Sequence, residues 1–114
     1  VAARSRAEVT AKSGMPPEYA QIERIARGMA DLTHLRLEGL MTMGPVTDAP
    51  EALRPYFRAT KQMFDQLASL GLPHVAMKTL SMGMSDSYQI AIEEGANMVR
   101  LGTILFGARQ YASR

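Results

Sequence analysis

The sequence contains no cysteine, which excludes disulfide bonds, thiolate metal sites and a cysteine nucleophile. It has no apolar run long enough to span a bilayer, and its charged first residues, Val1–Arg6, are not followed by the apolar stretch of a signal peptide. The formal net charge is only +2, so a strong electrostatic attraction to nucleic acid is absent. These absences predict a cytoplasmic protein without a membrane or nucleic-acid partner.

Length and composition suit one modest domain. The chain has 114 residues, of which 46% are hydrophobic and 21% charged, as in ordinary globular proteins, and a chain of this size buries only a small core. Its nine methionines are scattered along the chain, so we interpret them as adaptable core residues rather than metal ligands. Because the sequence begins with valine rather than methionine, we expect a fragment or a processed product.

Hydrophobic periodicity and turn residues predict helices that alternate with strands. The expected helices cover approximately residues 16–31, 48–70 and 86–95, and the expected strands cover residues 35–43, 74–80 and 97–101. Residues 1–14 show no clear period and are expected to form a loosely structured entry segment, and residues 104–109 begin a final helical turn. Alternating helices and strands indicate a parallel sheet with right-handed crossovers.

Local signals support the helix boundaries. The second helix begins at a capping-box-like segment, Asp48–Glu51, with a proline in its first turn, and Gly71 stands where a C′ glycine ends a helix. Ser85 or Asp86 is expected to cap the third helix. The residues expected to face the core are, on successive helices, Ile22, Ile25, Ala26 and Met29; Leu53, Phe57, Phe64 and Leu67; and Tyr88, Ala91 and Ile92.

Three parallel strands make an incomplete sheet, because parallel strands need both faces covered. The pattern therefore fits half of a (β/α) barrel better than a complete doubly wound domain. We expect residues 1–114 to form a single partial domain of the α/β class, with no internal repeat beyond the alternation itself.

Two small, polar, glycine-containing turns follow the last two predicted strands. The first spans Ser81 to Ser85 and includes Gly83, and the second is Gly102-Thr103. Barrels commonly bind phosphate at the loops after their last two strands, beside a helix N-terminus. Free backbone N–H groups, hydroxyls and the close approach that glycine permits predict a two-part phosphate clamp. The alternative is a serine-capped turn followed by a glycine turn, with no ligand.

Arg100 is the second informative residue. In a strand it faces the side opposite to Val99 and Leu101, which suit a helix-covered exterior. Arg100 then points into the barrel, where an unpaired charge is costly. We expect it to have a carboxylate partner, as in a structural ion pair, or a ligand, and its position next to Gly102-Thr103 favours the ligand.

The remaining polar residues offer weaker candidates. His34 and His74 precede their strands and lack metal-ligand spacing, so we predict surface or packing roles and no metal site. Thr42 and Met43 end the first strand and could line a pocket, although simple packing is the favoured role for Met43. Asp86 would repel a phosphate if its side chain faced the clamp. The carboxylates that we interpret as solvated are Asp65, Glu93 and Glu94.

Several segments resemble the pyridoxal-phosphate homeostasis proteins, single-domain proteins with the barrel fold of the alanine racemase N-terminal domain. The resemblance covers roughly residues 12–111, its last third is the most specific, and it identifies this chain with the C-terminal half of the family's (β/α)8 barrel. The segments that carry it are Leu80–Asp86, Ala91–Thr103 and Phe106–Arg109, and in the middle Lys12–Gly14, Leu37–Met43 and Pro55–Phe57.

The resemblance implies binding of pyridoxal 5′-phosphate (PLP). The family attaches PLP to a lysine on its first strand, has no established turnover, and is thought to buffer or deliver the cofactor in vitamin B6 balance. Ser81 and Gly102-Thr103 would hold the phosphate, assisted by Ser85, with Gly83 allowing close approach. Arg100 would face the pyridine nitrogen, where a cation disfavours protonation and so weakens the electron sink that PLP enzymes use.

The family's N-terminal half, which carries the Schiff-base lysine, has no counterpart here. The lysines present, Lys12, Lys61 and Lys78, do not match that position. A half barrel exposes open sheet edges and an apolar interior. We therefore expect it to pair with the missing half or with a second copy.

Two other functions remain open at this point. One is a PLP-dependent, racemase-like enzyme, which would need a second domain with a catalytic tyrosine, for which the sequence after Arg109 leaves no room. The other is a structural half-barrel fragment whose phosphate clamp is vestigial.

Overall fold

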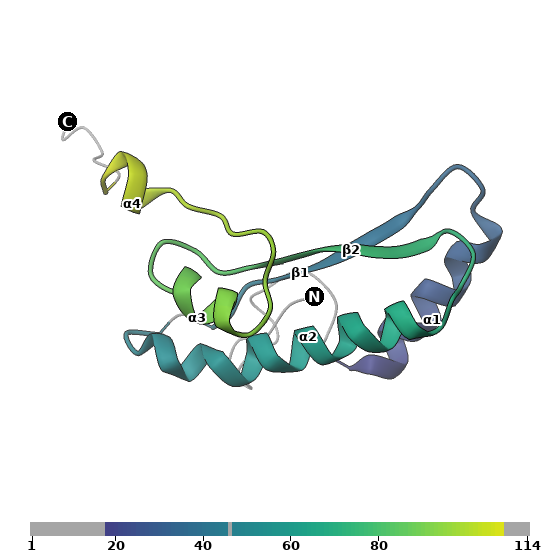
Figure 1. Ribbon diagram of the computed structural model, residues 1–114, viewed down its shortest axis with the longest axis horizontal. Coiled ribbons are helices and arrows are strands. Elements are labelled where there is room, and N and C mark those ends of the chain that lie inside the picture. Colours follow the sequence, from purple (N-terminus) through teal and green to yellow (C-terminus); the bar gives the residue numbers. More distant parts are fainter. Residues whose placement is uncertain (1–17, 46, 109–114) are drawn as a thin grey trace, which may run out of the picture.

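The computed structural model describes residues 18–45 and 47–108. The predicted entry segment and the prolines that open the first helix lie outside these residues. The helices and strands are α1 (Tyr19–Gly28), β1 (Leu37–Thr42), α2 (Arg54–Ser69), β2 (Val75–Met82), α3 (Tyr88–Glu93) and α4 (Thr103–Phe106), with short 3₁₀ turns at η2 (Met29–Asp31) and η3 (Pro50–Leu53). From α1 to α3, helices and strands alternate as the sequence predicts (Figure 1).

Strands β1 and β2 are parallel neighbours, and the connection between them contains α2. Their register shifts between the pairs Leu37–Val75 and Gly39–Thr79, so β2 contains two additional residues there. A Cβ at Gly39 would lie only 1.9 Å from the carbonyl oxygen of Thr79, so this close approach of the two backbones requires glycine.

The prediction of a third strand over residues 97–101 is wrong for the described structure, which has only an isolated parallel bridge between Ser81 and Met98. The backbone of this segment still pairs with β2: Asn97 and Met98 donate their N–H groups to the Leu80 carbonyl, and the Met98 carbonyl accepts from the N–H of Met82. The side chain of Asn97 adds two further bonds. Its Nδ2 donates to the carbonyl of Lys78 at 2.6 Å, and its Oδ1 accepts from the N–H of Leu80 at 2.7 Å. Further along, Arg100 donates its backbone N–H to the carbonyl of Gly83, and no regular ladder continues.

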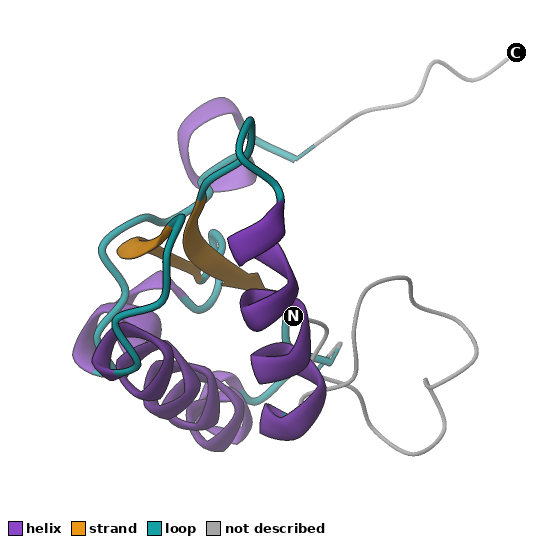
Figure 2. Cartoon of the chain, turned by 90° about the vertical axis from the view of Figure 1, so that its right-hand side faces the viewer, coloured by secondary structure: helices purple, strands orange, loops and turns teal. Residues whose placement is uncertain are grey.

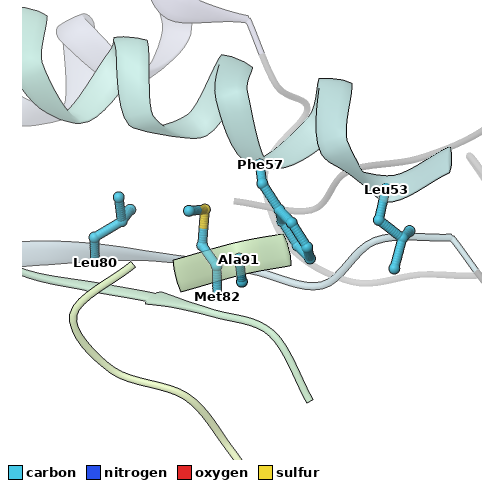
Figure 3. Close-up of a cluster of buried hydrophobic side chains, with 5 residues drawn as sticks. All are labelled: Leu53, Phe57, Leu80, Met82 and Ala91. Carbon is cyan, nitrogen blue, oxygen red and sulfur yellow. The ribbon is translucent and has the colours of Figure 1, made fainter. Parts of the chain in front are cut away.

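Helices α1, α2 and α3 cover one face of the sheet (Figure 1), and Figure 2 shows the two strands side by side above the longest helix. One buried cluster joins α1 to α2 and the first part of the sheet. The other joins α2 to the ends of the strands and to α3 (Figure 3). The buried residues are Ile22, Ala26, Met63 and Leu67 in the first cluster, and Leu53, Phe57, Leu80, Met82 and Ala91 in the second.

Some predicted details of the helices are wrong. Ile25 and Ile92 were expected to face the core, but they are 50% and 53% exposed, because no described element covers their side of α1 and α3. No side-chain hydrogen bond caps η3 or α2, so Asp48 does not form the expected capping box. The prolines at the start of η3 and α2 and the positive φ of Gly71, +62°, are as expected.

The face of the sheet opposite the helices carries half-exposed methionines, among them Met41, Met43 and Met98. An apolar side chain left exposed on a sheet face is a surface that another element normally covers. The fold is therefore an α/β arrangement of parallel strands and helices whose second face is open in the described residues. No helix among the described residues is both long and apolar enough to cross a membrane.

Candidate functional site

A cavity of about 280 Å³ opens at the carboxyl edge of the sheet, the edge where α/β proteins place their ligands. Its walls come from the end of β1 and the loop after it, from the start of α2, from the turn after β2, and from Arg100. The lining residues are Thr42, Met43, Gly44, Pro45, Thr47, Leu53, Phe57, Gly83, Met84, Asp86, Ser87 and Arg100. The prediction that Thr42 and Met43 line a pocket is confirmed.

Arg100 reaches across the end of β2 and donates from Nη2 to the backbone carbonyl of Thr42 at 2.9 Å. Its Nε is buried and has no hydrogen-bond partner among the described residues. No described carboxylate forms an ion pair with it, so the alternative of a structural ion pair is not found among the described residues. A guanidinium with one buried donor unused can donate a further hydrogen bond to an acceptor in the cavity.

The turn after β2 is shaped by Gly83 and Ser87. Gly83 has a φ of +96°, and a Cβ there would lie 2.7 Å from the Cβ of Ala91, so glycine is needed both for conformation and for space. The hydroxyl of Ser87 accepts the backbone N–H of Met84 at 3.1 Å, and the N–H of Ser87 donates back to the Met84 carbonyl. Ser87 was missed from the sequence, although a serine two residues beyond a predicted turn is a common turn-forming residue.

Ser85 joins the two predicted turns. Its Oγ accepts hydrogen bonds from the backbone N–H groups of Gly102 and Ile104, each at 3.1 Å. It therefore does not cap α3, whose N-cap position is Ser87 and carries no side-chain cap bond. Ser85 borders a second, shallower hollow of about 310 Å³ that also contains Asp86, and Gly102 and Thr103 are exposed beside it.

Ser81 lies elsewhere than expected. It was placed in the turn, but β2 continues to Met82, and Ser81 is a buried residue of the strand. It stands opposite Met41 in the sheet and forms the bridge to Met98. Neither of the two cavities at this edge includes it among its lining residues.

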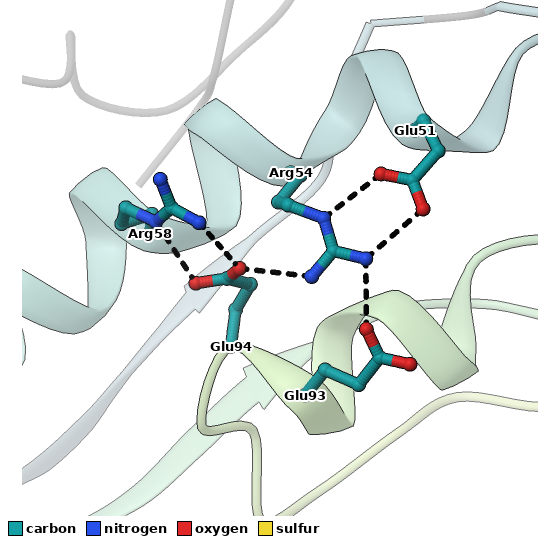
Figure 4. A network of polar contacts seen from close by, with 5 residues as sticks. All are labelled: Glu51, Arg54, Arg58, Glu93 and Glu94. Atoms are coloured by element: carbon teal, nitrogen blue, oxygen red, sulfur yellow. Dashed lines mark hydrogen bonds and ion pairs between the residues drawn. The ribbon is translucent and has the colours of Figure 1, made fainter.

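An ionic network fixes α3 against α2 (Figure 4). Arg54 binds Glu51, Glu93 and Glu94 at 2.8, 2.7 and 3.0 Å, and Arg58 binds Glu94 at 3.0 Å. The interpretation of Glu93 and Glu94 as solvated is wrong for Glu94, whose side chain is 12% exposed. Hydrogen bonds from Arg58 and Arg54 lower the pKa of Glu94, and a hydrogen bond from Arg54 lowers that of Glu51.

The described lysines point away from the cavity. Lys61 binds Asp65 at 2.9 Å and lies over the ring of Phe64, while Lys78 is exposed and lies 3.9 Å from Glu38. The third lysine, Lys12, is outside the described residues.

The histidines lie at the opposite end of the sheet from the cavity. His34 and His74 precede β1 and β2 and border a shallow polar hollow there. No group of three or more potential metal ligands occurs within residues 18–45 and 47–108.

Comparison with known families and sequences gives consistent matches. The model of a family described as alanine racemase, N-terminal domain, matches residues 8–110. Two curated relatives, both named pyridoxal phosphate homeostasis protein, come from Aquifex aeolicus and Escherichia coli. They are 42% and 39% identical over 103 and 104 residues, which is 88% and 90% of this chain. The matched part is 42% of each relative, so the chain spans less than half of their length.

Solved structures with a similar fold include PipY of Synechococcus elongatus with PLP bound. It has a TM-score of 0.72 and 26% identity, and the match covers 87% of this chain and 45% of PipY. A crystal structure from Bifidobacterium adolescentis, described as an unknown protein, has a TM-score of 0.75 and 34% identity, with 85% and 38% coverage.

Proposed function

This chain belongs to the alanine racemase N-terminal domain family, and from that membership we propose that it binds PLP and serves in PLP homeostasis without catalysing a reaction. Relatives that are 42% and 39% identical to it over the matched part carry the homeostasis name, and a structure of PipY has PLP bound. In this proposal the chain supplies the C-terminal half of a (β/α)8 barrel. A cytoplasmic location, and the lack of nucleic-acid or membrane partners, stay predictions.

The observation that carries the proposal is the cavity beside Arg100. Its volume of about 280 Å³ is near the lower end of the range for small-molecule sites. Leu53 and Phe57 give it an apolar wall suited to a flat ring, and the buried Nε of Arg100 lacks a partner. These residues fit a pyridine ring whose nitrogen accepts a hydrogen bond.

For the phosphate we propose the two turns that Ser85 connects. The Ser85 oxygen accepts two N–H groups, which leaves its own proton free to donate to a phosphate oxygen. The N–H of Gly102 already donates to Ser85, but Thr103 is exposed beside it, so an anion can reach the threonine side chain. The assignment of Gly83 and Ser81 to phosphate binding stays a prediction, and the buried position of Ser81 makes it the weakest member of the set.

The charge of Arg100 supports the proposed non-catalytic role. In PLP enzymes the cofactor supplies an electron-withdrawing ring, strongest when its nitrogen is protonated. A guanidinium at that nitrogen keeps the proton off, so the ring would be held with its electron sink weakened. Lys61 and Lys78 point away from the cavity, so we propose that this half of the site holds PLP without covalent attachment.

We further propose that the open face of the sheet is covered by the missing N-terminal half or by a second copy of this chain. The exposed Met41, Met43 and Met98 are the side chains that such a partner would bury. In the first case the partner also contributes the lysine.

The proposal is tested by titrating the chain with PLP and following absorbance, with its molar mass measured in the same samples. We expect saturable binding at one PLP per chain, in a species larger than a monomer or after addition of an N-terminal half. Borohydride reduction followed by intact-mass measurement should leave the lysines of this chain unlabelled, and a racemisation assay should show no turnover. Absence of saturable binding would overturn the function, and clear turnover would support an enzyme instead.

A further inference from the structure

Thr42 carries a buried hydroxyl that nothing in the described structure uses. The residue is 0% exposed, and its Oγ1 has no hydrogen-bond partner among the described residues. Buried polar atoms are nearly always paired, because an unpaired one loses its bonds to water without replacement. Thr42 ends a strand and lies on the wall of a cavity, so its hydroxyl is a candidate contact for a ligand.

A second unpaired atom lies in the same place. The Nε of Arg100 is also buried without a partner, and the same guanidinium is tied through Nη2 to the carbonyl of Thr42 at 2.9 Å. Both residues line the cavity at the carboxyl edge of the sheet. The two residues that carry the unused groups are thus joined by a hydrogen bond and border the same cavity.

The chemistry of the pair selects its occupant. An arginine Nε only donates, and a threonine hydroxyl can also donate, so the pair matches an acceptor atom that is neutral or negative. The neighbouring Leu53 and Phe57 favour a flat apolar ring that carries such an atom.

We propose that the Thr42 hydroxyl binds the ring of the ligand, acting together with the Nε of Arg100 on a nitrogen or oxygen acceptor of that ring. This inference rests on the proposed function and deepens it, because it names a ring-binding residue distinct from the phosphate-binding turns. A Thr42→Val substitution keeps the shape of the side chain and removes the hydroxyl, while Thr42→Ser keeps the hydroxyl.

The test compares these two variants with the unchanged chain against three probes: PLP, pyridoxal without its phosphate, and inorganic phosphate. Thr42→Val should weaken PLP and pyridoxal by about the same factor, roughly tenfold for one lost hydrogen bond, and leave phosphate binding unchanged. Thr42→Ser should stay within about twofold of the unchanged chain. Thermal melts of both variants show whether the fold is kept.

The outcomes separate this inference from the function on which it rests. If the unchanged chain binds PLP and Thr42→Val binds it equally well, the hydroxyl does not contact the ring and the inference is wrong, and a raised melting temperature would then identify a purely structural or water-filled position. If Thr42→Ser loses affinity as Thr42→Val does, packing rather than the hydroxyl is responsible. If the unchanged chain binds neither PLP nor pyridoxal, the proposed function fails, and this inference fails with it.

Discussion

The hydroxyl oxygen of Ser85 accepts the backbone N–H of Gly102 at 3.1 Å, across 17 positions of sequence. This bond, with the parallel one to Ile104, joins the turn after β2 to the start of α4. The two turns of the predicted phosphate clamp are therefore hydrogen-bonded to each other without a ligand.

Substituting Ser85 by alanine should weaken phosphate recognition. The two N–H groups lose their acceptor, and the hydroxyl proposed to donate to phosphate is gone, so we expect affinity for PLP and for inorganic phosphate to fall by about tenfold. Hydrogen exchange at Gly102 and Ile104 should also speed up. The control is Ser69→Ala at the end of α2, which removes only a bond to the Gln66 carbonyl. Unchanged affinity in the Ser85 variant would remove it from the site.

Replacing Arg100 by methionine should lower PLP affinity by at least about tenfold, because a charged donor is lost from the cavity. The PLP that still binds should show the absorbance of a more readily protonated ring, since the cation that disfavours protonation is absent. Arg36→Met is a suitable control, because Arg36 is exposed and makes only a long contact of 3.7 Å to Glu38. Equal loss in both variants would mean that net charge, not position, governs binding.

The network around Arg54 predicts a pH dependence of stability. The pKa of Glu94 is lowered from its ordinary value of 4.5 in the folded chain, so the unfolded chain binds a proton first as the pH falls. The stabilisation is complete above the unfolded pKa and is lost as the pH falls through the lowered, folded value. We expect the free energy of unfolding, measured with urea from about pH 7 to about pH 3, to decrease in this window.

Glu94→Gln should flatten that part of the profile. The matched control is Glu38→Gln, since Glu38 is half exposed and its contacts to Arg36 and Lys78 are 3.7 and 3.9 Å long. If the stability profile keeps its slope in Glu94→Gln and loses it in Glu38→Gln, the pH dependence comes from the contacts of Glu38, and the prediction for Glu94 is wrong.

Gly83→Ala should destabilise the fold by about 2 kcal/mol or more, because it adds the strain of a positive φ to an overpacked contact. Gly71→Ala has the same kind of φ, +62°, but nothing lies within 4 Å of its added Cβ. The difference between the two variants in urea denaturation therefore reports chiefly the crowding of the added methyl group by Ala91 and Tyr88, together with the larger φ of Gly83. Equal losses would show that the turn relaxes to accept the methyl group.

Much of the fold could be predicted from local signals. The helix that ends before Gly71 has apolar residues at helical spacing and a terminating glycine, and each of these acts within a few residues. The strand over 97–101 could not be rejected in the same way. Its residues have strand-like character and bond to β2 and the residue after it through the backbones of Asn97, Met98 and Arg100, but regular pairing is confined to the bridge at Met98. The side chain of Asn97 supplies the other bonds to β2, and local sequence does not show how far backbone pairing continues.

Parts of the candidate site could be predicted from residues whose type allows few structural roles at their position. Arg100 on an apolar strand and Gly83 after a strand stand out by chemistry alone, and both line the cavity. The role of Ser85 as a link between turns, and the enclosure of Glu94 by two arginines, depend on residues far away in sequence. No local pattern contains that information.

Asn97 also gives the protein a chemical vulnerability. Asparagine is among the residues that convert to a different side chain on heating and storage, and here its amide nitrogen donates to the Lys78 carbonyl at 2.6 Å. Deamidation would replace that donor by a carboxylate oxygen facing a carbonyl oxygen, and the edge of β2 would then be repelled by the group that had held it. Aged preparations should therefore lose structure at this edge first.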